Sequence, residues 1–279
     1  MPAKTVADIV TMKKAADKIT VLTAYDANFA RMIDAAGIDI VLVGDSLGMV
    51  ILGYDSTVPV TMEEMLHHCR AVRRGVSSAL LVGDMPFMSY QIGIESAIAN
   101  AGRFMKEAGC GAVKLEGGLE VCPQVEAIVR AGIPVMGHIG LTPQTAGKLG
   151  GYKVQGKDLE SARRLLKEAR ALEKAGVFSL VLECVPDVVA AVITEEIKVP
   201  TIGIGAGNAC DGQVLVTHDL LGLFDKFVPK FVKQYSSLSP VIKETLGSFV
   251  REVKDGSFPD AVHSFVGSPE LASSLRSKK

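Results

Sequence analysis

The chain has 279 residues, of which 48% are hydrophobic and 22% charged, and its formal net charge at pH 7 is −1. This length suffices for one large domain or two small ones. The near-neutral charge gives no electrostatic reason to expect a nucleic-acid partner, and no basic amphipathic helix points to a membrane surface. The apolar stretches around Val41 and Leu180 are interrupted by acids, so we expect no membrane span.

Residues 1–14 contain no apolar core of signal-peptide length, so we expect no secretory leader. The chain has five cysteines, an odd number, and none of them belongs to a C-x-x-C pair. We therefore expect reduced thiols and a cytoplasmic location. Cys184, beside Glu183, is the cysteine for which a role beyond packing stays open.

Apolar runs that a parallel sheet would bury on both faces alternate with helical patterns along the chain. Strands are predicted at 19–24, 40–46, 80–84, 112–116, 135–138, 179–183, 201–204 and 214–216. Helices are predicted at 5–16, 27–36, 61–74, 94–108, 119–131, 159–175, 187–197 and 239–253. This alternation predicts an α/β fold, a (β/α)8 TIM barrel with an N-terminal helix and a C-terminal helical extension. A doubly wound open sheet is the alternative arrangement.

Two kinds of local signal mark the ends of the predicted helices. The segment Thr61-Met-Glu-Glu64 has the spacing of a capping box and predicts a helix start. An Ala-Gly pair ends four predicted helices just before an apolar strand, and glycine can adopt the left-handed conformation found there. The four glycines are Gly37, Gly109, Gly132 and Gly176.

We expect a single barrel domain over residues 1–279. Its predicted parts are an N-terminal helix at 1–17, a barrel core at 18–224, and C-terminal helices and a tail at 225–279. The tail from Phe258 is predicted to be extended and to pack on a neighbouring subunit.

Polar side chains gather at the carboxyl ends of the predicted strands, the edge at which α/β folds bind ligands. The candidates are Asp45, Ser46, Asp84, Lys114, Glu116, His138 and Glu183. Lys114 and Glu116 stand two positions apart on one strand, so their side chains point the same way. If Glu116 faces the barrel mouth, Lys114 faces the interior just below it, where a lysine is costly unless it is paired.

Each of these residues also has a purely structural interpretation. Any one acid at a strand end can cap the next helix, and a lone histidine such as His138 can be a core residue with satisfied hydrogen bonds. So many charges at one end of a barrel are nevertheless expensive to bury without a counterion or a ligand. Several carboxylates without thiolate ligands favour a hard cation, most simply Mg2+, with waters left in place.

Such a site fits one type of reaction. Mg2+ with open positions acts as a Lewis acid on a carbonyl, Lys114 is available for a substrate anion, and Glu183 is the candidate general base. The combination predicts enolisation of a metal-chelated 2-oxo acid, followed by attack of the enolate on an electrophile. Two long loops at the same edge, 47–60 and 141–157, are predicted to cover the substrate.

Three other segments are less informative. The segment 203–208, Gly-Ile-Gly-Ala-Gly-Asn, lacks the glycine spacing of a phosphate-binding loop and predicts a tight turn. His67 and His68 have no acid at metal-binding spacing, so we interpret them as surface or packing residues. His218 and Asp219 follow the last strand and could line the barrel mouth, but their residue types assign them no role.

Nine segments distributed over most of the chain carry a resemblance to a known family. They are LTAYD at 22–26, VGDSLG at 43–48, GYDSTVPVT at 53–61, DMPFM at 84–88, VKLEGG at 113–118, GHIGLTPQ at 137–144, GGYKVQG at 150–156, LECVP at 182–186 and IGIGAGN at 202–208. With these segments the chain resembles the ketopantoate hydroxymethyltransferases. Motifs this long and this numerous are specific, whereas a single one would not be.

The resemblance implies a (β/α)8 barrel that transfers a one-carbon unit from 5,10-methylenetetrahydrofolate to 3-methyl-2-oxobutanoate. The product is 2-dehydropantoate, on the route to pantothenate and coenzyme A. The resemblance further implies Mg2+ held by Asp45 and Asp84, with Glu116 completing the metal site. It also implies a cytoplasmic homo-oligomer, typically a decamer.

Roles for the remaining candidates are likewise implied by the resemblance. The positions implied to lie at the bound oxo acid are Asp45, Ser46, Asp84, Lys114 and His138. Glu183 is implied to be the proton acceptor that acts on C3 of the oxo acid. What His138 does there stays open.

Two rival functions remain at this point. One is a Mg2+-dependent carbon–carbon lyase or phosphonomutase on a related barrel, which also uses an enolate beside a metal. The other is a non-catalytic barrel that serves as a binding or assembly module. Turnover that requires folate would separate the transferase from the first rival, and proton exchange on the oxo acid would separate it from the second.

Overall fold

The computed structural model describes residues 3–148, 150–224 and 228–277. Leu149 of the 141–157 loop and residues 225–227 of the C-terminal part lie outside the described residues, as do both chain ends. Within the described part, no helix has the length and apolar character that a bilayer crossing requires.

The strands form a closed parallel barrel in sequence order, from β1 to β8. They are β1 (Ile19–Thr23), β2 (Ile40–Val43), β3 (Leu80–Asp84), β4 (Ala112–Lys114), β5 (Val135–Gly140), β6 (Ser179–Glu183), β7 (Thr201–Ile204) and β8 (Gly212–Leu215). Strand β1 pairs with β8, with Val21 opposite Val214, and this pairing closes the sheet. The predicted (β/α)8 barrel is therefore confirmed, and the open sheet is excluded.

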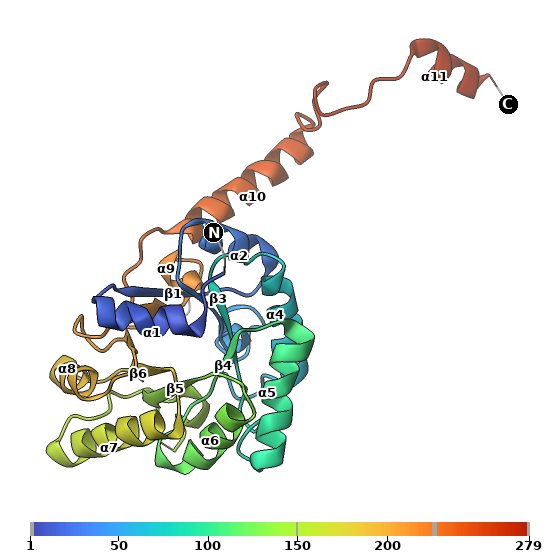
Figure 1. Cartoon of the computed structure of the whole chain (residues 1–279). Helices are drawn as coiled ribbons and strands as arrows, with labels where there is room; N and C mark the ends of the chain where they lie inside the picture. The colour runs from blue at the N-terminus through green and yellow to red at the C-terminus, as the bar shows by residue number, and fades with distance from the viewer. Residues whose placement is uncertain (1–2, 149, 225–227, 278–279) are drawn as a thin grey trace.

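Helices surround the barrel, as Figure 1 shows. Those between strands are α2 (Ala27–Ala35), α4 (Met62–Arg73), α5 (Ile94–Ala108), α6 (Cys122–Arg130), α7 (Leu159–Ala175) and α8 (Asp187–Glu196). Short helices α3 (Leu47–Val50) and α9 (Thr217–Leu220) lie in segments where no helix is predicted. The predicted capping box at Thr61 is present, and all four predicted helix-ending glycines have positive φ.

The hydrophobic core has two layers because successive side chains of each strand point to opposite faces. Ile40 and Leu42 of β2 point into the barrel, while Val41 and Val43 pack outward against the helices. The N-terminal end of the barrel is closed by α1 (Val6–Ala15), whose Ile9 is fully buried in the inner cluster. The amino end is thus closed by apolar contacts of α1.

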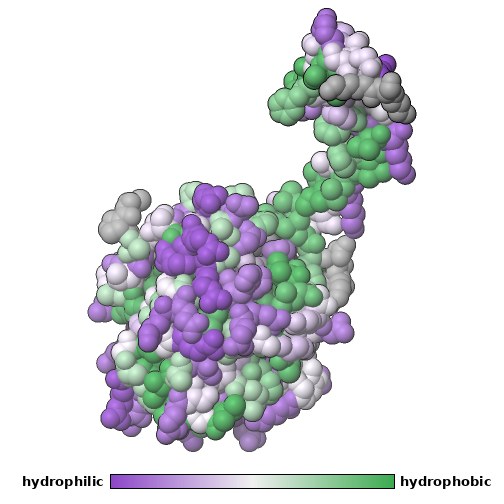
Figure 2. Space-filling model, turned by 90° about the vertical axis from the view of Figure 1, so that its right-hand side faces the viewer, coloured by the Kyte–Doolittle hydropathy of each residue, from purple (hydrophilic) through white to green (hydrophobic). Residues whose placement is uncertain are grey.

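Beyond the barrel, helix α10 (Leu238–Asp255) leads away from the body of the molecule, and none of its residues is buried. The tail does not remain extended as predicted, because α11 (Pro269–Arg276) forms near its end. Ser268 caps this helix through the Leu271 amide, and Pro269 occupies the first turn, a start signal that the sequence prediction overlooked. Figure 2 shows hydrophobic surface along this C-terminal arm.

Candidate active site

In four neighbouring strands, the side chains that face the barrel interior change from apolar to charged toward the carboxyl end of the barrel. The changes run from Val82 to Asp84, from Ala112 to Lys114 and Glu116, from Met136 to His138, and from Val181 to Glu183. Each step is two residues, which is the period of one strand face. The strand pattern therefore brings the predicted polar residues to one rim of the barrel, around one cavity.

Lys114 is paired, as its predicted burial requires. The register places Lys114 of β4 opposite Asp84 of β3, and the Lys114 Nζ donates to both Asp84 carboxylate oxygens at 2.8 and 2.9 Å. Glu116 Oε1 lies 3.7 Å from the same nitrogen. Burial alone would favour the neutral amine, but the nearby carboxylates of Asp84, Glu116 and Asp45 outweigh it and raise the lysine pKa.

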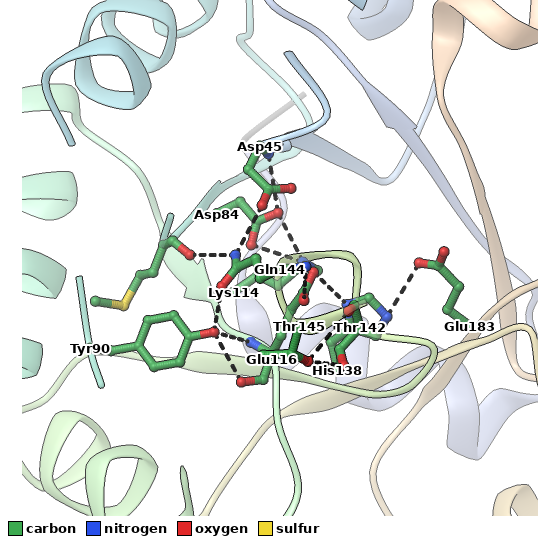
Figure 3. A network of polar contacts seen from close by, with 11 residues as sticks. Asp45, Asp84, Tyr90, Lys114, Glu116, His138, Thr142, Gln144, Thr145 and Glu183 are labelled. Atoms are coloured by element: carbon green, nitrogen blue, oxygen red, sulfur yellow. Dashed lines mark hydrogen bonds and ion pairs between the residues drawn. The ribbon is translucent and has the colours of Figure 1, made fainter. Parts of the chain in front are cut away.

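Gln144 links the acids of β2 and β4, and Figure 3 shows it at the centre of the polar network. Its side-chain amide nitrogen donates to Asp45 Oδ2 at 3.0 Å, and its backbone N–H donates to Glu116 Oε2 at 3.1 Å. The Tyr90 hydroxyl donates to Gln144 Oε1 at 2.7 Å. Asp45 and Asp84 are neighbours as well, because the Asp45 backbone N–H donates to Asp84 Oδ2 at 3.3 Å.

His138 lies between two carboxylates. Its Nδ1 is 3.4 Å from Glu116 Oε1, and its Nε2 is 3.3 Å from Glu183 Oε2. These are ion-pair distances, and neither ring nitrogen has a well-aligned hydrogen bond. Burial and Lys114 oppose protonation of the ring, but the Glu116 and Glu183 carboxylates outweigh them and raise the His138 pKa to about 9. The two carboxylates therefore favour the charged form of His138, which connects the Glu116 end of the network to Glu183.

Glu183 is positioned by close packing of the backbone at Gly140. Gly140 of β5 is paired with Glu183 of β6 and has a φ of +95°. A Cβ at residue 140 would stand 2.3 Å from the Glu183 carbonyl oxygen, so no side chain fits there. The same carbonyl accepts a hydrogen bond from the Leu141 amide at 2.8 Å. The β5–β6 register therefore holds Glu183 close to His138 at the rim.

Charge is unevenly distributed over this rim. Lys114 and His138 compensate Asp84, Glu116 and Glu183, whereas the only side-chain partner of Asp45 among the described residues is the neutral Gln144 amide. Burial, followed by the repulsion of Asp84 and Glu116, raises the Asp45 pKa well above its usual value. The Glu116 pKa is lowered despite burial, because the contacts with His138 and Lys114 favour its charged form. Uncompensated negative charge thus concentrates at Asp45.

This arrangement fits a hard divalent cation. The described residues contain no ready-made group of three or more His, Cys, Asp or Glu ligands. Mg2+ does not need such a group, because it is commonly held by one or two carboxylates and keeps several waters. Asp45 and Asp84 are adjacent carboxylates, and Asp45 has the fewest compensating partners of the rim acids, although Lys114 contacts both Asp84 oxygens. These two aspartates could therefore hold a cation, with the Glu116 carboxylate nearby.

The cavity above the rim has a volume of about 370 Å³, within the usual range of small-molecule sites. Both predicted loops contribute to its lining, through Met49 and Val50 of the first and Tyr152 and Val154 of the second. Ser46 also lines it. All seven candidate site residues from the sequence therefore border one cavity.

Several residues of the site were not predicted from the sequence. Gln144 and Tyr25 lie inside the segments that carry the family resemblance, and their polarity within those motifs was the available signal. Tyr25 contacts the Ser46 hydroxyl at 2.8 Å. Tyr90, whose hydroxyl also donates to the Glu116 carbonyl oxygen at 3.0 Å, lies outside those segments and gave no such signal.

Other residues noted in the sequence lie apart from the charged rim. His68 contacts the Tyr25 carbonyl oxygen at 2.7 Å and is a packing residue, as expected. His218 packs against the Tyr25 and Phe29 rings, and Asp219 borders the cavity. Cys184 borders the cavity with a φ of +49°, and burial, followed by the Glu183 charge, raises its pKa to about 11. A thiol with this pKa stays protonated at neutral pH, so Cys184 is not an activated nucleophile.

A closed (β/α)8 barrel with charged side chains around a cavity at the carboxyl ends of its strands defines a small-molecule barrel enzyme. Among solved structures, a phosphonopyruvate hydrolase in complex with oxalate and Mg2+ matches with a TM-score of 0.62 at 13% identity, covering 98% of this chain and 95% of that one. A 2,3-dimethylmalate lyase matches with a TM-score of 0.56 at 15% identity, covering 99% and 96%. At such low identities these structures support the fold alone.

Sequence comparison is far more specific. The profile of the ketopantoate hydroxymethyltransferase family matches residues 3–261. A 3-methyl-2-oxobutanoate hydroxymethyltransferase from Desulfotalea psychrophila is 62% identical over 265 residues, 95% of each chain. One from Carboxydothermus hydrogenoformans is 59% identical over 271 residues, covering 97% of this chain and 98% of that one. The chain belongs to the ketopantoate hydroxymethyltransferase family and is an enzyme of this transferase class, which confirms the resemblance in its motifs.

Proposed function

We propose that the protein transfers a hydroxymethyl group from 5,10-methylenetetrahydrofolate to 3-methyl-2-oxobutanoate, giving 2-dehydropantoate. Family membership supports this substrate pair. The observation that carries the proposal is the grouping at one rim of two adjacent aspartates with uncompensated charge and a separate carboxylate, Glu183, beside the same cavity. A reaction that polarises a carbonyl and removes a neighbouring proton needs both elements.

In this proposal Asp45 and Asp84 hold Mg2+, and Glu116 completes the metal site through water. Bound there, Mg2+ would act as a Lewis acid toward the keto and carboxylate oxygens of the oxo acid. Lys114 orients Asp84 through its two hydrogen bonds, and it adds positive charge near the substrate carboxylate. Ser46, held by Tyr25, provides a hydroxyl at the wall of the cavity.

Glu183 removes the proton from C3 of the oxo acid, and C3 then bonds to the methylene carbon of the folate. Both bonds from this carbon to the folate nitrogens break, and a water molecule supplies the hydroxyl group. The protons from C3 and from water end on the two nitrogens, which gives tetrahydrofolate. His138 contacts Glu183 at 3.3 Å and orients this carboxylate for proton transfer. Apolar side chains such as Val181 also border the cavity. The two loops that line the cavity would cover the substrate during the reaction.

The variant Glu183→Gln tests the assignment of the base. It should still bind Mg2+, since Asp45 and Asp84 remain, but exchange of the C3 proton of 3-methyl-2-oxobutanoate with solvent should slow by about 10²- to 10⁴-fold. Exchange is followed by NMR in deuterated water without folate, with Glu120→Gln, an exposed glutamate, as the control. Wild-type exchange rates in the Glu183 variant would remove Glu183 as the base.

Turnover with and without folate, together with the proton-exchange assay, separates the rival functions. Product formation that requires 5,10-methylenetetrahydrofolate supports the transferase. Cleavage of an oxo acid without folate would instead favour a carbon–carbon lyase or a phosphonomutase. Binding of the oxo acid with neither proton exchange nor turnover would favour a non-catalytic barrel.

We also propose that the protein is a cytoplasmic homo-oligomer, a decamer by family resemblance, assembled in part through α10. The exposed apolar side chains of this helix, spaced to share one face, are Ile242, Leu246, Phe249, Val250 and Val253. An exposed apolar stripe of this length normally marks an interface. Light scattering on Leu246→Glu with Phe249→Glu should give a smaller particle than wild type, and an unchanged mass would contradict this role of α10. The five free cysteines support a reducing compartment.

A further inference from the structure

One side of the cavity has a chemical character different from that of the charged rim. Strands β7 and β8 and the chain that follows them contribute the apolar side chains Ile204, Val214, Val216 and Phe231. We call these four residues the apolar wall. The Phe231 ring packs on Gly205, where a Cβ would stand 2.8 Å from the ring, so this side chain is closely fitted into the wall. The proposed roles of the rim residues leave this wall without a ligand.

Asp219 lies at this side of the cavity. Its carboxylate borders the cavity and takes part in no hydrogen bond or ion pair in residues 3–148, 150–224 and 228–277. Burial raises its pKa to about 6. Every other carboxylate that borders the cavity has at least one polar side chain in contact with it. The Asp219 carboxylate is half-buried and still reaches solvent, so a ligand in the cavity could replace that solvent as the hydrogen-bond donor.

The apolar wall and the Asp219 carboxylate together indicate the chemistry of a ligand that fits this side of the cavity. An apolar wall favours a flat heterocycle, and an acceptor-only carboxylate favours an edge with two parallel N–H donors. Lys230 borders the same cavity in an exposed position, where it offers positive charge to an anionic extension of such a ligand. A heterocycle with an amino-substituted, N–H-bearing edge and an acidic tail combines all three properties.

We propose that Asp219 and the apolar wall bind the pterin ring of the one-carbon donor, with Asp219 accepting hydrogen bonds from the ring N–H and the 2-amino group. This inference rests on the proposed function, because it assumes a folate co-substrate. It assigns the two substrates to different sides of one cavity, the oxo acid to the charged rim and the pterin to the apolar wall. Asp219 is then a specificity residue for the donor and has no part in proton removal.

The test compares binding of tetrahydrofolate to wild type, Asp219→Asn and the control Asp17→Asn, measured by titration calorimetry. Asparagine keeps one acceptor but presents an N–H₂ group to the pterin donors, so the dissociation constant should rise by about 10- to 100-fold. Asp17 is exposed and far from the cavity lining, so its variant should bind as wild type does. A 2-deamino analogue of tetrahydrofolate should bind weakly to wild type and lose little further affinity in Asp219→Asn.

Proton exchange on the oxo acid without folate distinguishes this inference from the proposed function. Exchange at the wild-type rate in Asp219→Asn, together with weakened tetrahydrofolate binding, supports the inference. An unchanged dissociation constant, or loss of exchange in Asp219→Asn, overturns it and leaves the transferase proposal standing. Absence of exchange in the wild-type enzyme would sink the proposed function itself, and the pterin assignment with it.

Discussion

Asp39 and Asp45 stand at opposite ends of strand β2, and they are almost equally buried, with 6% and 4% of their surface exposed. Asp39 accepts hydrogen bonds from the Thr20 backbone amide and hydroxyl, each at 2.7 Å, and from the Lys4 ammonium. Asp45 accepts one side-chain hydrogen bond, from Gln144 at 3.0 Å. The two aspartates thus have similar exposed surface but different polar partners, and Asp45 also lies deeper in the protein.

The pKa values of the two aspartates move in opposite directions. Burial would raise both, but the contacts of Asp39 with Lys4 and Thr20 lower its pKa below the usual value. At Asp45 burial is reinforced by the neighbouring acids, and the pKa rises. A buried carboxylate with enough hydrogen-bond donors stabilises the fold. A buried carboxylate without them is unfavourable until a cation binds and neutralises its charge. Asp39, at the amino end of the barrel, thus contributes to stability, whereas Asp45, at the carboxyl end, is suited to the proposed chemistry.

Exchanging each aspartate for asparagine should separate these two roles, and the largest effect is expected at Asp45. Asp45→Asn should lower turnover by about 10³-fold, because a proposed metal ligand is lost. Its free energy of unfolding should not fall, since one repelling charge is removed. Titration with Mg2+ should show weakened binding. Full Mg2+ affinity in this variant would contradict the metal assignment.

Asp39→Asn should show the reverse pattern. Its free energy of unfolding should fall by about 1–3 kcal/mol, because donors of Thr20 and Lys4 lose their charged acceptor. Turnover per folded molecule should stay at the wild-type level. Urea denaturation and steady-state kinetics on the same preparation check both statements, and a turnover loss like that of Asp45→Asn would abolish the contrast between the two ends.

Asp34 is a second buried carboxylate with several hydrogen-bond donors, and its contribution to stability should depend on pH. It accepts hydrogen bonds from the backbone amides and hydroxyls of Ser77 and Ser78 and from the Ala79 amide. Burial opposes ionisation, but these donors outweigh it and hold the Asp34 pKa far below its usual value. Because the folded-state pKa is depressed, its contribution to stability is present above the unfolded pKa of about 4 and is lost as pH falls.

Asp34→Asn should therefore cost about 2–3 kcal/mol of unfolding free energy at pH 7. The gap to wild type should narrow as pH falls below about 4, where the wild-type carboxylate loses its advantage. Urea denaturation at pH 7 and at a pH below about 4 measures this difference, with Asp17→Asn as a control whose stability should match wild type. A gap that stays constant with pH would show that the charge of Asp34 is not what stabilises the fold.

Glycine replacements leave all charges in place and test packing alone. Gly83 precedes Asp84, and a Cβ there would stand 2.4 Å from the Phe104 ring, so Gly83→Ala should destabilise by about 1–3 kcal/mol. Gly102, in α5, has open space around it, and Gly102→Ala should stabilise by about 0.5–1 kcal/mol. Thermal unfolding of the two variants should shift in opposite directions, and equal shifts would contradict the packing explanation.

Local patterns predicted a large part of this molecule. The capping box at Thr61 and the left-handed glycines appear as expected, because the backbone conformations they favour depend on few neighbouring residues. Strand parity predicted that Lys114 faces the barrel interior and needs a partner, and the register of β3 with β4 supplies Asp84 as that partner. The sequence prediction missed helix α11, although Ser268 and Pro269 signal its start. None of its residues is buried in a core, so the sequence has no core-facing periodicity there to support a helix.

By itself, the sequence determined the order of strands and helices, the family, and which residue types reach the barrel rim, since these follow from short-range periodicity and long motifs. Only the tertiary structure decided that Gln144 joins Asp45 across 99 residues of chain and that His138 connects two carboxylates. It also decided that Asp219 borders the cavity without a side-chain partner among the residues that the structure describes. The physical reason is that burial and pairing depend on side chains contributed by distant segments. Those segments meet only when the barrel closes.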